Sequence, residues 1–324
     1  MNVAIIGSGA YGLALALMIN KNTKNIKMWT KFEEEKNMLQ TKRENEKVLK
    51  GVKIPENIIF TTDLTSAVTD AELVIIAVPT AFVDGVSKEL KDILKSNQHI
   101  CIASKGIEQD SCLFGQDIFY KYNDNKNFAV ISGPSFAVDI ASMCPIGLSL
   151  ATLNEDTEKV VRDALEGDLL KLRTTTDIIG VEVCGAIKNV IAIASGMLDG
   201  MGYPASTQAM FITESLHDIK HLIHDLGGSK KTILSFAGFG DLLLTATSIK
   251  SRNYRLGKLI GSSASKEEVD DYINNTTIEG LYTLKSIKKL LEDKKLELPI
   301  IDLIYNIIYN GESPNALVKF LIEK

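Results

Sequence analysis

The sequence predicts an α/β protein in two parts, a largely parallel β-sheet with helices on both faces followed by an all-helical C-terminal domain. Short apolar runs alternate with helical or turn-rich segments as far as Thr175, which is typical of a parallel sheet. A glycine-rich loop separates the first run from an apolar helical segment, and the alternation stops after Thr176. We therefore expect a sheet domain over residues 1–180 and a helical domain over residues 181–324.

The short apolar runs are the expected strands. They are rich in Val, Ile and Leu, as strands are that lie buried between two layers of helices. The expected strands are Val3–Ile6, Ile26–Trp29, Ile58–Thr61, Leu73–Val78, His99–Ala103, Phe128–Ile131, Ile146–Leu153 and Leu170–Thr175. In the second part, we expect helices over Val181–Gly196 and from Ala205 to Leu226, and Ile300–Ile308 reads as core or as the subunit contact of a homodimer.

The glycine-rich loop is Gly7-Ser8-Gly9-Ala10-Tyr11-Gly12. It follows the first expected strand and opens the helical run Leu13–Ile19, which is the context of a Rossmann-type dinucleotide site. The first glycine permits a tight turn, the second lets a pyrophosphate approach the backbone, and the third lets the helix pack against the strand. N–H groups at the helix start then bind the anion. A purely structural turn is the alternative.

The choice between NADPH and NADH depends on the end of the second expected strand. NAD-preferring folds carry an acidic residue there that binds the ribose hydroxyls. This strand runs into Thr30-Lys31-Phe32, and the first acid is Glu33. Lys31 suits a 2′-phosphate, which favours NADPH, but it also suits a solvated helix start, so NADH stays open.

Three expected strands end in small or turn-forming residues, at Val78-Pro79-Thr80, Ser104-Lys105-Gly106 and Ser132-Gly133-Pro134-Ser135. Ligands of parallel sheets bind outside the carboxyl ends of the strands. We therefore expect these ends to converge on the cofactor, where Lys105 would be the one cation that they supply. The alternative is a lysine in a surface turn.

The helix expected over Val181–Gly196 is apolar nearly all round, so it should be buried. Lys188 is its one interior cation, and its neighbours along the helix are mostly small, which leaves room beside the ammonium. Burial lowers the pKa of a lysine, and a lowered pKa suits a general acid near neutral pH. The alternative is a buried stem whose head reaches water.

Two later segments carry polar groups in unusual settings. Ala237-Gly238-Phe239-Gly240-Asp241-Leu242 places an acid in an apolar, glycine-flanked turn, where it needs a partner, and Lys188 is the natural candidate. Ser251-Arg252-Asn253 offers a hydroxyl, a guanidinium and an amide just ahead of an apolar helix, which suits a phosphate. A cationic helix start on the surface is the alternative for the second segment.

Composition argues against several other classes of protein. A net charge of −5 disfavours nucleic acid as the main partner, and four scattered cysteines indicate a reducing cytoplasm. No apolar run approaches the roughly 20 residues of a membrane span, so no membrane insertion is expected. His217, His221 and His224 share one helical face with Glu214, but Asp218 and Lys220 indicate that this face is solvated, so no metal site is expected.

Taken together, these motifs resemble NAD(P)-dependent glycerol-3-phosphate dehydrogenase of the bacterial type over essentially the whole chain. The matching segments are the glycine loop, Ala77-Val78-Pro79, Ser104-Lys105-Gly106-Ile107-Glu108, Ser132-Gly133-Pro134-Ser135-Phe136-Ala137, Gly185-Ala186-Ile187-Lys188-Asn189, Gly238-Phe239-Gly240-Asp241-Leu242 and Ser251-Arg252-Asn253. Two places depart from the family pattern. Val48-Leu49-Lys50-Gly51 stands where the family often has Tyr-Leu-Pro-Gly, and Glu214 lies near the position of a usual arginine.

The resemblance implies roles for individual residues. Lys188 looks like the family's catalytic lysine, supported by Asp241 and Lys105. The implied substrate contacts are Lys105, Gly133, Ser135, Lys188, Asp241, Ser251, Arg252 and Asn253. The implied cofactor site is lined by Gly7, Gly9, Ala10, Tyr11, Gly12, Lys31, Lys105, Ala137, Arg252, Thr277 and Glu279.

The reaction that the resemblance implies is reversible NAD(P)H-dependent reduction of dihydroxyacetone phosphate to sn-glycerol 3-phosphate, which supplies glycerophospholipid synthesis. Two alternatives stay open, another two-domain dehydrogenase that acts on a hydroxy acid and a non-catalytic dinucleotide-binding sensor. Ser251-Arg252-Asn253 argues against the first, because a carboxylate substrate would not need this full set of phosphate-binding groups. Lys188 and Asp241 argue against the second, because a sensor has no use for a buried acid–base pair.

Overall fold

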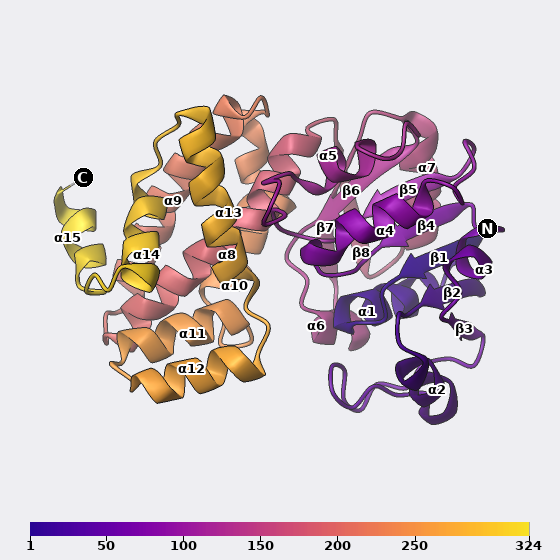
Figure 1. Cartoon of the computed structure of the whole chain (residues 1–324), viewed down its shortest axis with the longest axis horizontal. Coiled ribbons are helices and arrows are strands. Elements are labelled where there is room, and N and C mark those ends of the chain that lie inside the picture. The colour runs from indigo at the N-terminus through magenta and orange to yellow at the C-terminus, as the bar shows by residue number, and fades with distance from the viewer. Residues whose placement is uncertain (324) are drawn as a thin grey trace. The chain divides into compact units, whose positions relative to one another are not determined.

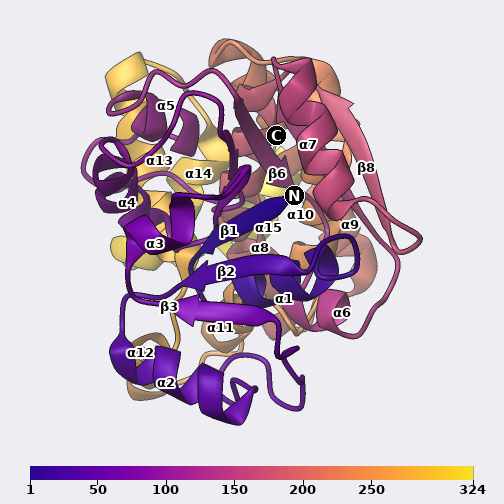
Figure 2. The ribbon, with the colours of Figure 1, turned by 90° about the vertical axis from the view of Figure 1, so that its right-hand side faces the viewer.

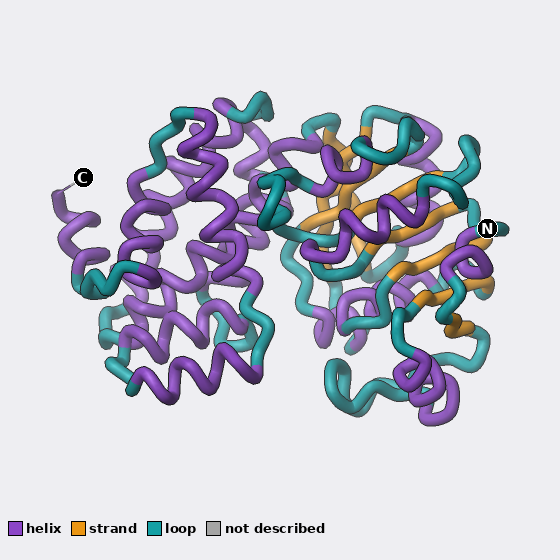
Figure 3. Tube along the Cα trace, viewed as in Figure 1, coloured by secondary structure: helices purple, strands orange, loops and turns teal. Residues whose placement is uncertain are grey.

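The computed structural model describes residues 1–323, and these form two compact units. Unit 1 comprises Met1–Lys105 and Gly115–Ile178, and unit 2 comprises Gly106–Phe114 and the described residues from Ile179 onward. The short segment Gly106–Phe114 is thus part of the second unit, although the sequence analysis expected it in the sheet domain. Within the described chain, strands occur in unit 1 and unit 2 is helical, as Figure 3 shows.

Unit 1 is built on a single sheet of eight strands in the order β3-β2-β1-β4-β5-β6-β7-β8. Neighbouring strands are parallel except for β6 and β7, which are antiparallel. The strands are β1 (Asn2–Ile6), β2 (Asn25–Trp29), β3 (Ile58–Thr61), β4 (Leu73–Ile76), β5 (His99–Ile102), β6 (Phe128–Ser132), β7 (Ile146–Thr152) and β8 (Leu170–Thr175). The predicted fold class and all eight expected strands are confirmed, although β4 ends at Ile76, two residues before the expected Val78.

Helices cover both faces of this sheet. Val3 and Ile5 of β1 pack into a core with the apolar residues of α1, while Ala4 and Ile6 are equally buried and point to the opposite face. Helix α1 packs beside α6 and α7, and α3 lies against β1 and β2 (Figures 1 and 2). The helices of unit 1 are α1 (Ala10–Ile19), α2 (Glu33–Lys42), α3 (Leu64–Val68), η1 (Thr80–Phe82), α4 (Val83–Leu90), α5 (Gly115–Tyr120), α6 (Ala137–Ala141) and α7 (Glu155–Leu165).

Unit 2 is assembled around the long helix α8 (Ile178–Gly200). The remaining helices are α9 (Ala205–Asp225), η2 (Lys230–Leu234), η3 (Phe236–Gly240), α10 (Asp241–Ala246), α11 (Arg252–Gly261), α12 (Lys266–Asn275), α13 (Glu279–Lys294), α14 (Pro299–Tyr309) and α15 (Ala316–Glu323). The expectation that α8 is buried is confirmed, since its residues from Val181 to Leu198 are all buried.

Helix α8 corrects one expectation of the sequence analysis. Its 23 residues are long and apolar enough to cross a membrane, with a mean hydropathy of 1.7 over an 18-residue window. The apolar run appeared shorter in the sequence because Glu182, Lys188 and the terminal residues interrupt it. However, 89% of that window is buried inside the protein. A helix that is apolar all round and covered by other helices is the core helix of a globular domain.

Four glycines bring α8 and α11 into direct backbone contact. A Cβ on Gly257 would lie 1.8 Å from the carbonyl oxygen of Ile193, and one on Gly196 would lie 2.1 Å from that of Tyr254. Gly200 and Gly261 meet the partner helix in the same way. Because the backbones touch, Tyr254 is buried beside α8, and burial, followed by its hydrogen bond to Asp199, raises the pKa of this phenol to about 12.

Candidate active site

The glycine loop of unit 1 has the geometry of a dinucleotide site. Gly7 has a φ of 118°, and a Cβ there would lie 2.8 Å from the carbonyl oxygen of Ala77. A Cβ on Gly12 would lie 2.2 Å from the carbonyl oxygen of Gly7, so side chains are excluded where α1 packs against the loop. Gly9 has open space instead and is the N-cap of α1. The loop therefore fits a pyrophosphate, which approaches the backbone at the open glycine and the positive helix end.

The carboxyl ends of β4, β5 and β6 are joined by hydrogen bonds. Ser104 Oγ donates to the carbonyl oxygen of Val78 at 2.5 Å. Thr80 Oγ1 donates to the carbonyl oxygen of Lys105 at 3.0 Å. Lys105 Nζ in turn donates to the carbonyl oxygen of Gly133 at 3.1 Å. The expectation that these three strand ends lie together is confirmed, and Lys105 is half-buried among them.

At the end of β2, the nearby carboxylates are engaged by other side chains. Glu33 accepts hydrogen bonds from Lys36 at 2.5 Å and from Thr62 at 2.8 Å, and these bonds lower the pKa of Glu33. Glu35 accepts from the hydroxyl of Thr30. Lys31 is exposed and makes no hydrogen bond or ion pair with any of residues 1–323. Glu33 and Glu35 are thus engaged, whereas Lys31 and Glu34 are exposed at this edge.

In unit 2, the Lys188 ammonium lies in a buried polar cluster. Lys188 Nζ is 2.6 Å from Asp241 Oδ1 and 3.2 Å from Thr245 Oγ1. Asp241 is 1% exposed and Lys188 is 8% exposed, so the pair is almost fully removed from water. The Thr245 hydroxyl donates to the carbonyl oxygen of Asp241 at 2.6 Å, which leaves its oxygen to accept from Lys188. The predicted pairing of Lys188 with Asp241 is confirmed.

The backbone around Asp241 differs from the expected turn. Asp241 is the first residue of α10, and the preceding glycines lie in the wide helical turn η3. Gly238 has a φ of −84° and a ψ of −105°, and a Cβ there would lie 2.3 Å from the carbonyl oxygen of Ile233. The kink at Gly238 aims the start of α10 at α8. Sequence analysis missed Thr245, although its position one helical turn after Asp241 could have indicated it.

The start of α11 carries the expected phosphate-binding segment. Ser251 is the N-cap and its hydroxyl accepts a hydrogen bond from the N–H of Tyr254 at 3.2 Å, which confirms a helix start here. Arg252 is exposed at the first helical position. Asn253 is 7% exposed, and its side chain donates to Asn189 Oδ1 at 3.0 Å and accepts from the N–H of Gly280 at 2.9 Å. Asn253 therefore ties α11 to α8 and α13.

The other predicted cofactor residues occupy helix starts or lie just before them. Ala10 and Ala137 are the first residues of α1 and α6 in unit 1. Glu279 is the first residue of α13 in unit 2 and accepts from Asn189 Nδ2 at 3.3 Å, whereas Thr277 is exposed in the preceding loop. Among the described residues, no group of three or more His, Cys, Asp or Glu side chains is arranged to hold a metal.

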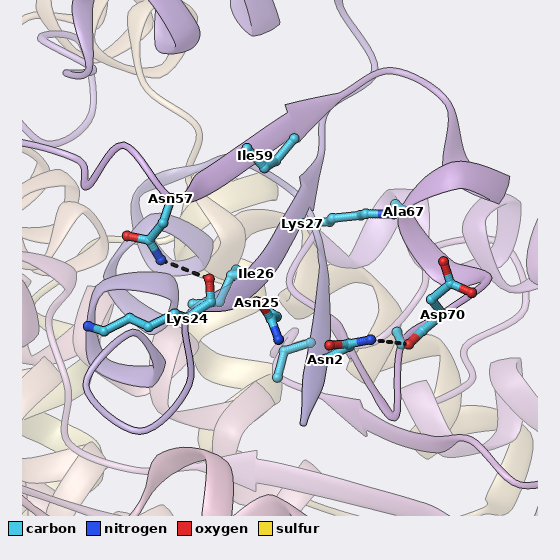
Figure 4. Close-up of a pocket in the computed structure, with 11 residues that line it drawn as sticks. Asn2, Lys24, Asn25, Ile26, Lys27, Asn57, Ile59, Ala67 and Asp70 are labelled. Atoms are coloured by element: carbon cyan, nitrogen blue, oxygen red, sulfur yellow. Dashed lines mark hydrogen bonds between the residues drawn. The ribbon is translucent and has the colours of Figure 1, made fainter.

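A cavity of about 320 Å³ in unit 1 lies away from these groups (Figure 4). It is lined by residues at the amino ends of β1 and β2, opposite to the ends where the glycine loop begins. Two of its side-chain amides are already bonded to the protein, because Asn2 Nδ2 donates to the carbonyl oxygen of Asp70 at 3.0 Å and Asn57 Nδ2 donates to that of Lys24 at 2.9 Å. We therefore do not assign this cavity to the cofactor or the substrate.

Comparison with known proteins gives full-length matches. Residues 2–158 match the N-terminal domain model of NAD-dependent glycerol-3-phosphate dehydrogenase, and residues 177–319 match the C-terminal domain model. The chain is 36% identical to the glycerol-3-phosphate dehydrogenase (NAD(P)+) of Thermoanaerobacter sp. strain X514 over 324 residues, which cover 100% of this chain and 97% of that protein. It is 33% identical to the enzyme of the same name from Fusobacterium nucleatum, with 99% and 96% covered.

Solved structures agree with these matches. The crystal structure of glycerol-3-phosphate dehydrogenase from Coxiella burnetii superposes with a TM-score of 0.92 at 29% identity, covering 100% of this chain and 99% of that one. D-mandelate dehydrogenase shares the fold with a TM-score of 0.65 at 14% identity, so the fold alone does not select the substrate. The matched domains, the glycine loop and the full-length relatives together show that this chain belongs to the NAD(P)-dependent glycerol-3-phosphate dehydrogenase family of oxidoreductases.

Proposed function

We propose that the chain catalyses the reversible reduction of dihydroxyacetone phosphate to sn-glycerol 3-phosphate with NADPH or NADH. The observation that carries this proposal is the buried Lys188 ammonium, held 2.6 Å from Asp241 Oδ1 and 3.2 Å from Thr245 Oγ1. Such a pair is costly to bury, and a structural role could be filled by apolar residues of similar volume. The buried pair is explained if Lys188 is a proton donor that Asp241 must hold in one orientation.

In the proposed reaction, Lys188 is the general acid. The dihydronicotinamide, when bound, supplies the hydride that forms the new C–H bond at C2 of the substrate. Lys188 Nζ gives a proton to the carbonyl oxygen as negative charge grows on it, and the reverse direction returns the proton to the amine. Asp241 and Thr245 hold the ammonium in place, so no reorganisation is needed as the charge develops. Lys105 is proposed as a further catalytic residue, as the resemblance to the family implies.

Arg252 is proposed to bind the substrate phosphate. A guanidinium can donate two parallel N–H hydrogen bonds to a phosphate, and the dipole at the helix start favours the same anion. Ser251, the buried N-cap, fixes that helix start, and Asn253 fixes its direction through Asn189 and Gly280. A hydroxy-acid substrate has no phosphate and would leave Arg252 without the group that it is proposed to bind. The remaining proposals are a role in glycerophospholipid precursor synthesis, a cytoplasmic location and a homodimer.

One set of assays tests the proposed function. Oxidation of NADPH and of NADH is followed by absorbance with dihydroxyacetone phosphate, with dihydroxyacetone and with a 2-oxo acid. We expect oxidation only with the phosphorylated ketone. Turnover of the 2-oxo acid alone would indicate a hydroxy-acid dehydrogenase. Tight binding of NADPH without turnover of any substrate would indicate a dinucleotide sensor.

A further inference from the structure

Tyr11, in the glycine loop, belongs to a hydrogen-bond network with three residues at the ends of β5 and β6. Its hydroxyl lies 3.1 Å from Ser135 Oγ. Ser135 Oγ lies 3.1 Å from the carbonyl oxygen of Gly133, and Lys105 Nζ lies 3.1 Å from that same oxygen. The Lys105 ammonium also lies 5.6 Å from the centre of the Tyr11 ring. All four residues belong to unit 1 and are buried or half-buried.

The direction of each hydrogen bond follows from the groups involved. A carbonyl oxygen can only accept, so the single proton of the Ser135 hydroxyl goes to Gly133. The Tyr11 hydroxyl must then be the donor to Ser135 Oγ. Because a hydroxyl oxygen has two lone pairs, one of those on Ser135 is taken by Tyr11 and one remains. The Gly133 carbonyl, with donors from Lys105 and Ser135, has both of its lone pairs occupied.

We propose that Tyr11 is a positioning residue that fixes Ser135 as a hydrogen-bond acceptor, and that Ser135 thereby recognises the hydroxymethyl group of the substrate. This inference rests on the proposed function. A phosphate or carboxylate oxygen brings lone pairs at neutral pH and would meet the remaining lone pair of Ser135 unfavourably. A hydroxyl brings a proton and fits it. Ser135 is therefore assigned to the hydroxyl end of the triose and not to its phosphate.

Tyr11 is well placed for this role because its backbone is fixed. It lies in the first turn of α1, directly before Gly12, whose close contact with Gly7 holds the loop. Its ring presents a face to the Lys105 ammonium, an arrangement that restrains both side chains. Phenylalanine at this position would keep that face and would lose the donor to Ser135. Tyr11→Phe thus removes the hydrogen bond that the proposal concerns and keeps the ring.

The test compares dihydroxyacetone phosphate with hydroxyacetone phosphate, in which a methyl group replaces the hydroxymethyl group. The wild-type chain is expected to show kcat/KM at least about tenfold higher for the hydroxylated ketone, the scale of one lost hydrogen bond that leaves a buried acceptor unpaired. Ser135→Ala should bring this ratio close to 1. Tyr11→Phe should lower it several-fold, because Ser135 is then free to turn its proton elsewhere.

Two control variants lie outside the network. Ser142→Ala removes an exposed hydroxyl at the end of α6, and Tyr305→Phe removes a phenol on α14. Both should keep the wild-type ratio. A purely structural role for Tyr11 or Ser135 would lower turnover of the two ketones equally and leave the ratio intact. An unchanged ratio in Ser135→Ala or in Tyr11→Phe therefore overturns the proposal.

A binding experiment separates this inference from the proposed function. Calorimetry on the NADP+-saturated chain compares sn-glycerol 3-phosphate with propane-1,2-diol 1-phosphate, which lacks the terminal hydroxyl. The wild type should bind the first about tenfold more tightly, and Ser135→Ala should bind both alike. If no ketone is turned over but this difference is present, the proposed reaction fails and the assignment of Ser135 stands. Equal binding by the wild type, or no binding of either compound, overturns the assignment.

Discussion

Lys188 on α8 and Asp241 at the start of α10 form an ion pair of 2.6 Å in which the side chains are 10% and 1% exposed. Two charges so far from water attract each other strongly, but each has lost its hydration, so the net gain in stability is small. Removing either partner leaves the other charge buried and uncompensated. The pair therefore holds the ammonium in one position, which is what proton transfer to a bound substrate needs.

Replacing Lys188 by methionine keeps the volume of the stem and removes the ammonium. We expect kcat to fall by about 10²-fold to 10⁴-fold, the contribution of a positioned general acid, while the Kd for NADPH stays close to that of the wild type. The measurement is steady-state turnover with NADPH and dihydroxyacetone phosphate, beside NADPH binding by fluorescence.

The matched control is Lys258→Met on α11. Lys258 also pairs with a carboxylate, at 2.7 Å from Asp199, but its side chain is 48% exposed. This variant should keep kcat, because an exposed pair contributes little and lies outside the proposed site. Normal turnover in Lys188→Met, in a chain shown by circular dichroism to be folded, would remove Lys188 from the chemistry.

Arg252 is exposed at the first position of α11, so its substitution should affect binding more than folding. We expect Arg252→Ala to raise the KM for dihydroxyacetone phosphate by about 10-fold to 100-fold, which corresponds to the loss of a charged hydrogen bond of about 1.5–3 kcal/mol. Arg252→Lys should recover part of this, because it restores the charge without the bidentate geometry. The measurement is the dependence of initial rate on ketone concentration, and an unchanged KM in Arg252→Ala would contradict the assigned role.

Much of unit 1 could be predicted because the strands of a parallel sheet are marked by continuous apolar runs. The eight runs were recognisable, and the glycine spacing located the loop between β1 and α1. The antiparallel pairing of β6 with β7 was not recognisable, because a strand buried on both faces has the same composition in either direction. The pairing of Lys188 with Asp241 was predictable, because burying an unpaired charge costs much free energy and each of these two charges can compensate the other.

The packing within unit 2 could not be predicted in the same way. Gly196 was only the last residue of an expected apolar helix, and the sequence analysis gave no role to Gly200, Gly257 or Gly261. Only the structure shows that they face one another with their backbones in contact. Likewise, the hydroxyl of Tyr11 carries no periodic signal, and its role depends on a neighbour that is remote in the sequence.

The contact between α8 and α11 should not tolerate a side chain. A Cβ on Gly257 would lie 1.8 Å from the carbonyl oxygen of Ile193, so Gly257→Ala must separate the two helices. We expect a loss of at least about 1–3 kcal/mol in the free energy of unfolding, measured by urea denaturation. Gly85→Ala on α4 is the matched control, since a Cβ there meets nothing within 4 Å, and it should stabilise the chain by about 0.5–1 kcal/mol. Equal effects of the two substitutions would contradict this account.

Cofactor preference should depend on Lys31. Glu33 and Glu35 are bonded to Lys36, Thr62 and Thr30, whereas the ammonium of Lys31, the first charged group after β2, is exposed. We expect the wild type to prefer NADPH and Lys31→Glu to shift the ratio of kcat/KM for NADPH over NADH towards NADH by about 10-fold or more. Lys21→Glu, at the far end of α1, makes the same change of charge away from the loop and should leave the ratio unaltered. A wild type that prefers NADH would contradict the role given to Lys31.

The stability of unit 1 should fall in mild acid because of His99. Burial at the start of β5 lowers the pKa of His99 below its ordinary value of 6.5, although Glu72 and Asp156 oppose this, and Nδ1 lies 2.9 Å from Thr157 Oγ1. The unfolded chain therefore takes up a proton on His99 near pH 6.5, whereas the folded chain resists it until a lower pH. Stability is then fully present above pH 6.5 and decreases as the pH falls below it. Urea unfolding between pH 7.5 and about 5 should show a steeper decline for the wild type than for His99→Gln. Identical slopes for the wild type and His99→Gln would show that His99 contributes nothing to the decline.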